Sequence, residues 1–185
     1  MNLIVGLGNP GANYEGTRHN AGCQAVEVIA TRWRLPLQDT LSYAKMGRGE
    51  VKGAMVMLAY PNTYMNHSGD AIAPMLARFR LQVSGLLVVY DDMDLPLGTL
   101  RMRRQGGTGG HKGMGSIVAA LGTQDFSRLR VGIGRPPAGL EEVGYLLSPF
   151  TPEEKEILVK VYRQVAEAAE CWLLEGIEVA MNRFN

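Results

Sequence analysis

The chain has 185 residues, of which 46% are hydrophobic and 20% charged, with a formal net charge of +1 and two cysteines. This length suffices for one packed core, and no linker or internal repeat interrupts it, so we expect a single domain over residues 1–185. No stretch approaches the roughly 18 uninterrupted apolar residues of a membrane span. The cysteines have neither disulfide nor metal spacing. We therefore expect a cytoplasmic protein without membrane contacts.

The first predicted element is an apolar run that ends in the glycine-rich turn GLGNPG at residues 6–11. This run predicts a buried strand, and sites in α/β folds form where such strands end. Asn9 lies in this turn, and His19 lies in the polar stretch that follows it. Apolar residues at helical spacing over 21–34 place His19 at or just before a helix N-terminus, which disfavours the protonated imidazole. His19 is thus a candidate general base.

The glycines at positions 6, 8 and 11 also match the G-x-G-x-x-G pattern of dinucleotide-binding folds. That pattern requires a helix directly after the glycines, so that its N-terminus meets the pyrophosphate. Here Asn13, Gly16 and Thr17 prolong the loop instead. A dinucleotide site is retained only as an alternative.

One or two strands are predicted over residues 43–60, which alternate and then become apolar, and Pro61 ends them. The loop that follows presents an aromatic ring, a thioether and a carboxamide: Tyr64, Met65 and Asn66. A helix comes next, with Ser68 or Asp70 as its expected N-cap. This is a second polar loop at the end of a strand.

The continuous apolar run from Gly85 to Tyr90 predicts a central strand, and Asp91, Asp92 and Asp94 follow it directly. Clustered carboxylates could hold a hard cation, but no Glu or His accompanies them at ligand spacing. Alternatively, Asp91 orients His19 and stabilises its imidazolium form.

The segment 95–140 is strongly basic. Its only acid is Asp125, against the cations Arg101, Arg103, Arg104, Lys112, Arg128, Arg130 and Arg135. Such a surface suits a polyanion, because each neutralised phosphate releases counterions, although a plain solvated surface remains the alternative. Within this segment, the glycine-rich stretch 106–115 is expected to form either a lid or a flexible surface loop.

A long C-terminal helix is predicted by the capping box at residues 151–154, and it ends at Gly176. Its buried face is expected to run from Ile157 to Trp172. The sequence contains no G-x-S-x-G nucleophile, so the simplest hydrolytic chemistry is attack by a water molecule that His19 deprotonates. Asn66 or backbone N–H groups of the glycine turn would stabilise the oxyanion. The other histidines, His67 and His111, carry less weight and can be structural.

Five segments, in this order, resemble the bacterial-type peptidyl-tRNA hydrolase family: GLGNPGANYEGTRHNAG (6–22), PNTYMNHSG (61–69), YDDMDLPLG (90–98), GGTGGHKG (106–113) and RLRVGIG (128–134). The resemblance implies an α/β fold in which helices flank a twisted, mixed and largely parallel sheet. It also implies cleavage of the ester between a peptide and tRNA, which recycles peptidyl-tRNA released from ribosomes. No cofactor and no metal are expected, and the expected state is a monomer.

The resemblance also implies roles for individual residues. His19, Asp91 and Asn9 would be catalytic, and Asn9 would distinguish a peptide-bearing substrate from free aminoacyl-tRNA. Arg103 and Arg130 would clamp the 5′-phosphate of the acceptor stem, a task suited to the guanidinium fork. The full set of expected substrate- and tRNA-binding residues is Tyr14, Tyr64, Met65, Asn66, Lys112, Arg101, Arg103 and Arg130.

Lys112 departs from the family motif, which usually has asparagine at this position. Lysine can only donate hydrogen bonds, and it adds a positive charge. We expect activity to survive with altered substrate handling. The alternative is a catalytically weak or inactive relative that only binds RNA.

Overall fold

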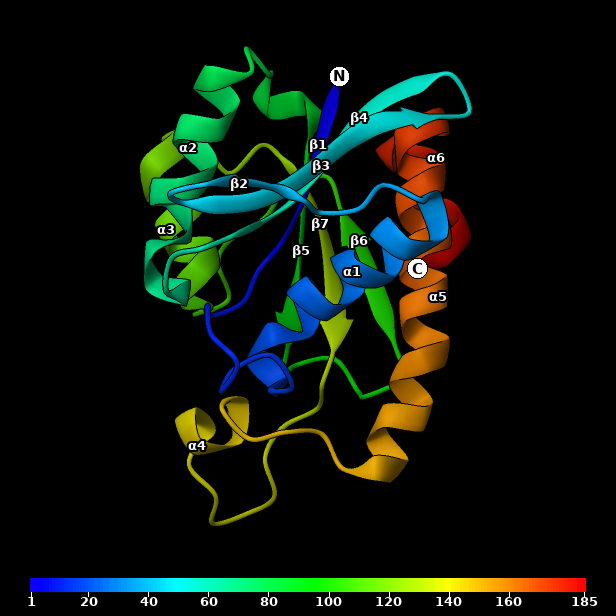
Figure 1. The fold of residues 1–185 in the computed structure, drawn as a ribbon. Coiled ribbons are helices and arrows are strands. Elements are labelled where there is room, and N and C mark those ends of the chain that lie inside the picture. Colours follow the sequence, from blue (N-terminus) through cyan, green and yellow to red (C-terminus); the bar gives the residue numbers. More distant parts are fainter.

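The computed structural model describes all of residues 1–185 as one seven-stranded sheet between two layers of helices (Figure 1). The strands are β1 (Asn2–Gly6), β2 (Asp39–Leu41), β3 (Ala44–Val51), β4 (Ala54–Pro61), β5 (Leu86–Asp92), β6 (Leu100–Arg103) and β7 (Ser127–Gly132). They lie in the order β2-β3-β4-β1-β5-β7-β6. The four strands β4, β1, β5 and β7 are parallel, and β2, β3 and β6 pair antiparallel. The expected mixed, largely parallel α/β sheet is confirmed.

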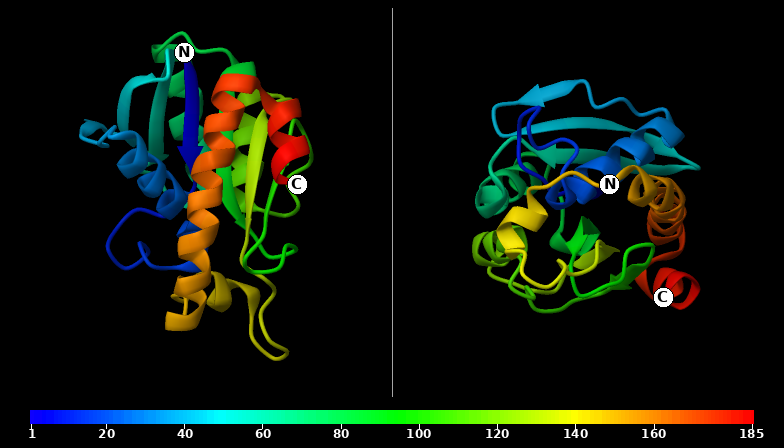
Figure 2. Two further views of the ribbon diagram at one scale, coloured as in Figure 1. Left: turned by 90° about the vertical axis from the view of Figure 1, so that its right-hand side faces the viewer. Right: turned by 90° about the horizontal axis from the view of Figure 1, so that it is seen from below.

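Helices cover both faces of this sheet (Figure 2). The helices are α1 (Ala21–Trp33), α2 (Ser68–Arg78), α3 (Lys112–Leu121), α4 (Glu142–Leu146), α5 (Pro152–Glu175) and α6 (Ile177–Phe184). Short 3-10 turns are η1 (Arg18–Asn20), η2 (Met65–His67) and η3 (Val83–Gly85). One core cluster of 29 buried residues packs α1, α5 and α6 on one face, and a second of 17 packs α2 and α3 on the other. None of the helices combines the length and hydropathy that crossing a bilayer requires.

Several local predictions can be compared with the structure. The capping box is confirmed, since Thr151 Oγ1 accepts from the N–H of Glu154, and the Glu154 carboxylate accepts from the N–H of Thr151. The prediction that Ile157 is buried was wrong, because its position on α5 leaves it 42% exposed. The predicted cap of α2 was also wrong: η2 runs directly into the helix, so Ser68 lies inside it and donates to the carbonyl of Met65.

Two glycines allow α1 to approach the sheet closely. A Cβ atom on Gly6 would lie 2.3 Å from the carbonyl oxygen of Gly22, and one on Gly22 would lie 2.2 Å from that of Val89. No side chain fits at either contact. This packing brings η1, and with it His19, to the edge of the sheet. The dinucleotide pattern requires a helix directly after the glycines. Here residues 7–17 separate β1 from η1, so the chain does not meet this requirement.

Gly22→Ala is expected to lower the free energy of unfolding by about 1–3 kcal/mol, because the added methyl group must displace backbone atoms. Urea unfolding followed by circular dichroism measures the change. Gly16→Ala is the matched control, since Gly16 is exposed and no atom lies within 4 Å of the place that an added methyl group would take. Equal stability of the two variants would contradict the close packing of α1.

Candidate active site

A cavity of about 980 Å³ lies at the carboxyl ends of the parallel strands, between the loops that follow them and α4. Most of the expected site residues line it: Asn9, His19, Met65, Asn66, Asp91, Arg103, Lys112 and Arg130. Three others, Tyr14, Tyr64 and Arg101, are not among its lining residues. Tyr14 and Tyr64 instead form an edge-on ring pair, with centroids 6.4 Å apart.

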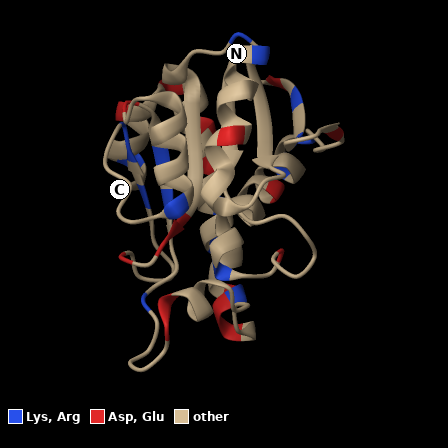
Figure 3. Cartoon of the chain, turned by 90° about the vertical axis from the view of Figure 1, so that its left-hand side faces the viewer, with Lys and Arg blue, Asp and Glu red and all other residues tan.

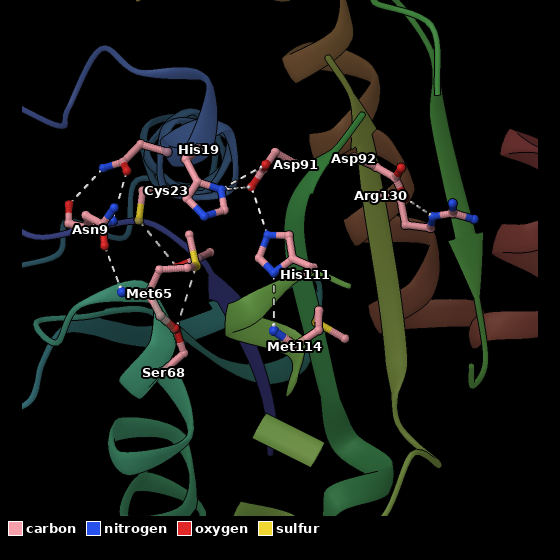
Figure 4. A network of polar contacts seen from close by, with 12 residues as sticks. Asn9, His19, Cys23, Met65, Ser68, Asp91, Asp92, His111, Met114 and Arg130 are labelled. Carbon is pink, nitrogen blue, oxygen red and sulfur yellow. Dashed lines mark hydrogen bonds and ion pairs between the residues drawn. The ribbon is translucent and has the colours of Figure 1, made fainter. Parts of the chain in front are cut away.

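Asp91 lies between two histidines (Figure 4). Its two carboxylate oxygens lie 3.0 and 2.9 Å from Nδ1 of His19, and Oδ1 also lies 3.0 Å from Nε2 of His111. Asp91 is 2% exposed and His19 is 8% exposed. The carboxylate is therefore buried with a nitrogen on each side.

The alternation of side chains along β5 explains this arrangement. Tyr90 packs in the core on the α2 and α3 side, so Asp91 points to the α1 side, where η1 supplies His19. His111 arrives from the other layer, because it occupies the N-cap of α3. Asp91 thus joins the two helical layers at the edge of the sheet.

The hydrogen bonds determine which ring nitrogens carry protons. The backbone N–H of Met114 donates to Nδ1 of His111 at 3.2 Å, so this nitrogen is an acceptor and the ring proton lies on Nε2, facing Asp91. An ionised Asp91 only accepts, so His19 also directs a proton toward it, from Nδ1. In neutral His19, Nε2 is then left unprotonated. This is the form required of a general base.

Asp91 is ionised throughout the neutral range. Burial alone favours its neutral acid, but His111 first and His19 second oppose this effect and lower the pKa of Asp91 to about 2. The carboxylate is therefore available to stabilise an imidazolium.

The ligand atoms of His19, Asp91 and His111 lie within 4.8 Å of one another, a grouping that could hold a metal ion. A metal on Nε2 of His111 would require the proton on Nδ1, where it would face the N–H of Met114. Two donors would then oppose each other. The tautomer of His111 favours a hydrogen-bonded network over a metal site.

Asn9 is held so that its amide NH₂ group stays free. Its side-chain oxygen accepts from the N–H of Met65 at 2.8 Å. Asn20 fixes its backbone from both sides, accepting from the N–H and donating to the carbonyl, each at 2.9 Å. Since Asn9 lines the cavity and its NH₂ makes no bond within the chain, it presents a hydrogen-bond donor there.

Four arginines share one face of the β6–β7 pair at the edge of the sheet, where Figure 3 shows basic residues on the strands nearest the C-terminus. Arg101 lies opposite Arg130, and Arg103 lies opposite Arg128. Like charges in direct opposition are unfavourable unless anions or hydrogen bonds compensate them. This edge therefore favours an anionic ligand.

The arginines differ in the hydrogen bonds that they make within the chain. Arg128 is 1% exposed and donates to the carbonyls of Gly106, Gly107 and Gln124, so it anchors the glycine loop. Nε of Arg130 donates to Asp92, which leaves its two terminal nitrogens without a hydrogen bond in the chain. Arg103 bonds only to the neighbouring carbonyl of Met102. Arg103 and Arg130 remain available at the cavity.

Cys23 is not a nucleophile candidate. Burial, reinforced by the negative charges of Glu27 and Asp91, raises the pKa of its thiol far above the usual range. Its Sγ donates to the carbonyl of Gly6. The thiol stays protonated and inert.

Sequence reasoning gave little weight to His111 and missed Arg18. A signal for His111 existed, since it stands between a glycine loop and a predicted helix, as His19 stands before α1. Arg18 is buried and binds Ser148, Pro149 and Glu154. Those partners are distant in sequence, and no local pattern indicates them.

The fold and the site together define a class: α/β proteins with a histidine–aspartate pair in a cavity at the carboxyl edge of the sheet. A family model described as peptidyl-tRNA hydrolase matches residues 3–185. This chain belongs to the peptidyl-tRNA hydrolase family.

Individual relatives agree with this assignment. The chain is 47% identical to a peptidyl-tRNA hydrolase of Synechococcus sp. (strain JA-3-3Ab), with 100% of this chain and 83% of the relative covered. It is 50% identical to a peptidyl-tRNA hydrolase of Roseiflexus castenholzii, with 100% of this chain and 87% of the relative covered. The crystal structure of peptidyl-tRNA hydrolase from Acinetobacter baumannii is similar at a TM-score of 0.94 and 33% identity, with 100% and 94% covered.

The buried carboxylate predicts a specific pH dependence of stability. Because the pKa of Asp91 is lowered from 3.8 to about 2 on folding, its stabilisation is complete above pH 4 and is lost as the pH falls toward 2. The stability of the wild type relative to Asp91→Asn should therefore fall by about 1 kcal/mol between pH 5 and pH 3. Urea titrations at the two pH values measure this difference, and a constant difference would contradict the lowered pKa.

Proposed function

We propose that this chain hydrolyses the ester between a peptide and tRNA with water that His19 activates. The observation that carries the proposal is the Nδ1 contact of His19 with Asp91, which leaves Nε2 as the unprotonated nitrogen of a ring that lines the cavity. Membership of the peptidyl-tRNA hydrolase family supplies the substrate class. The fold and the chemistry of the site thus support the same reaction.

In the proposed reaction, Nε2 of His19 takes a proton from water as the water oxygen attacks the ester carbonyl carbon. Asp91 stabilises the imidazolium that forms. The bond from this carbon to the ribose oxygen then breaks, and the imidazolium returns the proton to the ribose oxygen. The products are a free peptide acid and tRNA, and no second acid is required.

The developing oxyanion needs hydrogen-bond donors already in place. The amide NH₂ of Asn9 is one candidate, since its oxygen is occupied by Met65. Asn66 is another, because it lines the cavity and makes no hydrogen bond within the chain. A donor fixed at Asn9 also suits recognition of a peptide carbonyl, which free aminoacyl-tRNA lacks.

The tRNA is proposed to bind along the edge formed by β6 and β7. Arg103 and the terminal nitrogens of Arg130 would hold the 5′-phosphate of the acceptor stem, while Arg101 extends the basic face. Recognition through shape and phosphates requires no reading of bases. The Tyr14 and Tyr64 pair would line the substrate path outside the cavity. We further propose that the protein acts in the cytoplasm, as a monomer.

Lys112 is compatible with this function. It is the first residue of α3, it is exposed, and it lines the cavity without an ion pair to any acid. Its ammonium group is free to contact a phosphate. No observation favours the alternative of an inactive RNA-binding relative.

His19→Ala should lower kcat for peptidyl-tRNA by about 10²–10⁴-fold, because the general base is removed, while tRNA binding stays close to wild type. Release of peptide from tRNA, measured at saturating substrate with and without a chelator, gives the result. His67→Ala is the matched control, since His67 is exposed and outside the cavity lining. Wild-type turnover in His19→Ala would remove His19 from the mechanism.

Arg103→Gln should raise KM without a comparable loss of kcat, and should reduce the slope of log K against log salt by about 1, as expected for one lost phosphate contact. The effect should disappear with tRNA that lacks its 5′-phosphate. Arg32→Gln provides the control, because Arg32 lies on α1, away from this edge, and pairs with Glu167. An equal effect of Arg103→Gln on both tRNA forms would contradict the 5′-phosphate assignment.

A further inference from the structure

We propose that His111 is a second positioning residue for the hydrolysis: acting through Asp91, it fixes which nitrogen of His19 carries the proton. This inference rests on the proposed role of His19 as the base. It extends the site from a histidine–aspartate pair to a histidine–aspartate–histidine network.

The first support is an unbroken chain of hydrogen bonds (Figure 4). The N–H of Met114 donates to Nδ1 of His111 at 3.2 Å, and Nε2 of His111 donates to Oδ1 of Asp91 at 3.0 Å. Nδ1 of His19 donates to the same carboxylate at 2.9 Å. The backbone of α3 thus determines the tautomer of His111. The hydrogen bond that His111 donates favours the ionised form of Asp91, which can only accept from His19.

The second support is the burial of His111. Its side chain is 9% exposed, and the rings of Tyr90 and His19 each lie with their centroids 5.0 Å from its own. A ring held on two sides by packing and on two edges by hydrogen bonds has little rotational freedom. It can therefore hold the plane of the Asp91 carboxylate, a torsion that is otherwise broad.

The third support is the charge balance around Asp91. A buried carboxylate needs several donors to offset its lost hydration. His111 supplies one of them from Nε2, and His19 supplies the other from Nδ1. The titratable groups that face His111 are Asp91 and Tyr90 from β5 and His19 from η1, while the neighbouring Lys112 is exposed.

The position of His111 also links the base to the glycine loop. His111 is the last residue of the loop, and Arg128 holds the other end through the carbonyls of Gly106 and Gly107 at 2.6 and 2.9 Å. Just inside α3, Gly113 packs so closely that a Cβ atom would lie 2.6 Å from Sδ of Met65. The end of the loop that carries His111, the residue in contact with Asp91, therefore packs against the core.

Two variants separate the bond to Asp91 from the cap of α3. His111→Asn keeps a favoured N-cap oxygen for the N–H of Met114, but its side chain is too short to reach Asp91. His111→Gln has a longer carboxamide whose NH₂ can reach Asp91. His67→Asn is the matched control, because His67 occupies the N-cap of α2 and contacts Asp70, not Asp91.

For His111→Asn we expect a folded protein with lower thermal stability than the wild type, because the buried carboxylate of Asp91 loses one donor. The KM should stay within about twofold of wild type, and kcat should be about 10- to 100-fold lower, the size of effect seen when the hydrogen-bond partner of a functional side chain is lost. The acid limb of the kcat/KM profile should move to higher pH, because Asp91 with one donor fewer attracts the imidazolium more strongly. His111→Gln should restore most of kcat, and in an Asp91→Asn background His111→Asn should have little further effect.

Wild-type kcat and an unchanged pH profile in His111→Asn would overturn the inference, as would losses that simply add in the double variant. If His19→Ala is inactive while His111→Asn is fully active, the role of His19 as the base is supported and the positioning role of His111 is contradicted. If His19→Ala retains activity, the proposed function fails and the inference fails with it.

Discussion

The site depends on one buried charge, the carboxylate of Asp91 between two imidazole rings. Such a charge is tolerated in the interior only when its lone pairs are satisfied, and here two histidines satisfy them. Because an ionised carboxylate accepts and never donates, both rings must turn a protonated nitrogen toward it. The unprotonated Nε2 of His19 is thus a consequence of the charge state of its neighbour.

The fold brings these three groups together through its topology. Asp91 is the penultimate residue of β5, and helices that pack on opposite faces of the sheet bring His19 and His111 to that end of the strand. Close approach at Gly22 lets α1 reach the sheet, and Gly113 lets the start of α3 pack against the side chains of Met65 and Leu7. The basic edge of β6 and β7 borders the same cavity, so the histidine–aspartate pair and the surface proposed to hold RNA phosphates share one side of the molecule.

Much of this arrangement follows from local sequence patterns. The apolar runs that end at Gly6 and Tyr90 predict buried strands, and sites in α/β folds form where such strands end, which is why Asp91 could be proposed as the partner of His19. Interactions between distant segments could not be predicted in this way. Arg128, expected on a basic face, is buried, and its two terminal nitrogens donate to the carbonyls of Gly106, Gly107 and Gln124. His111 and Arg18 likewise acquire their partners only in the folded chain.

The most direct test of the account is the tautomer of His19, read from ¹⁵N chemical shifts and two-bond couplings of the imidazole in the folded protein near neutral pH. A His19 base oriented by Asp91 carries its proton on Nδ1 and none on Nε2, and His111 shows the reverse pattern. A His19 ring that carries its proton on Nε2 would contradict the account, because the nitrogen assigned to water activation would then be a donor.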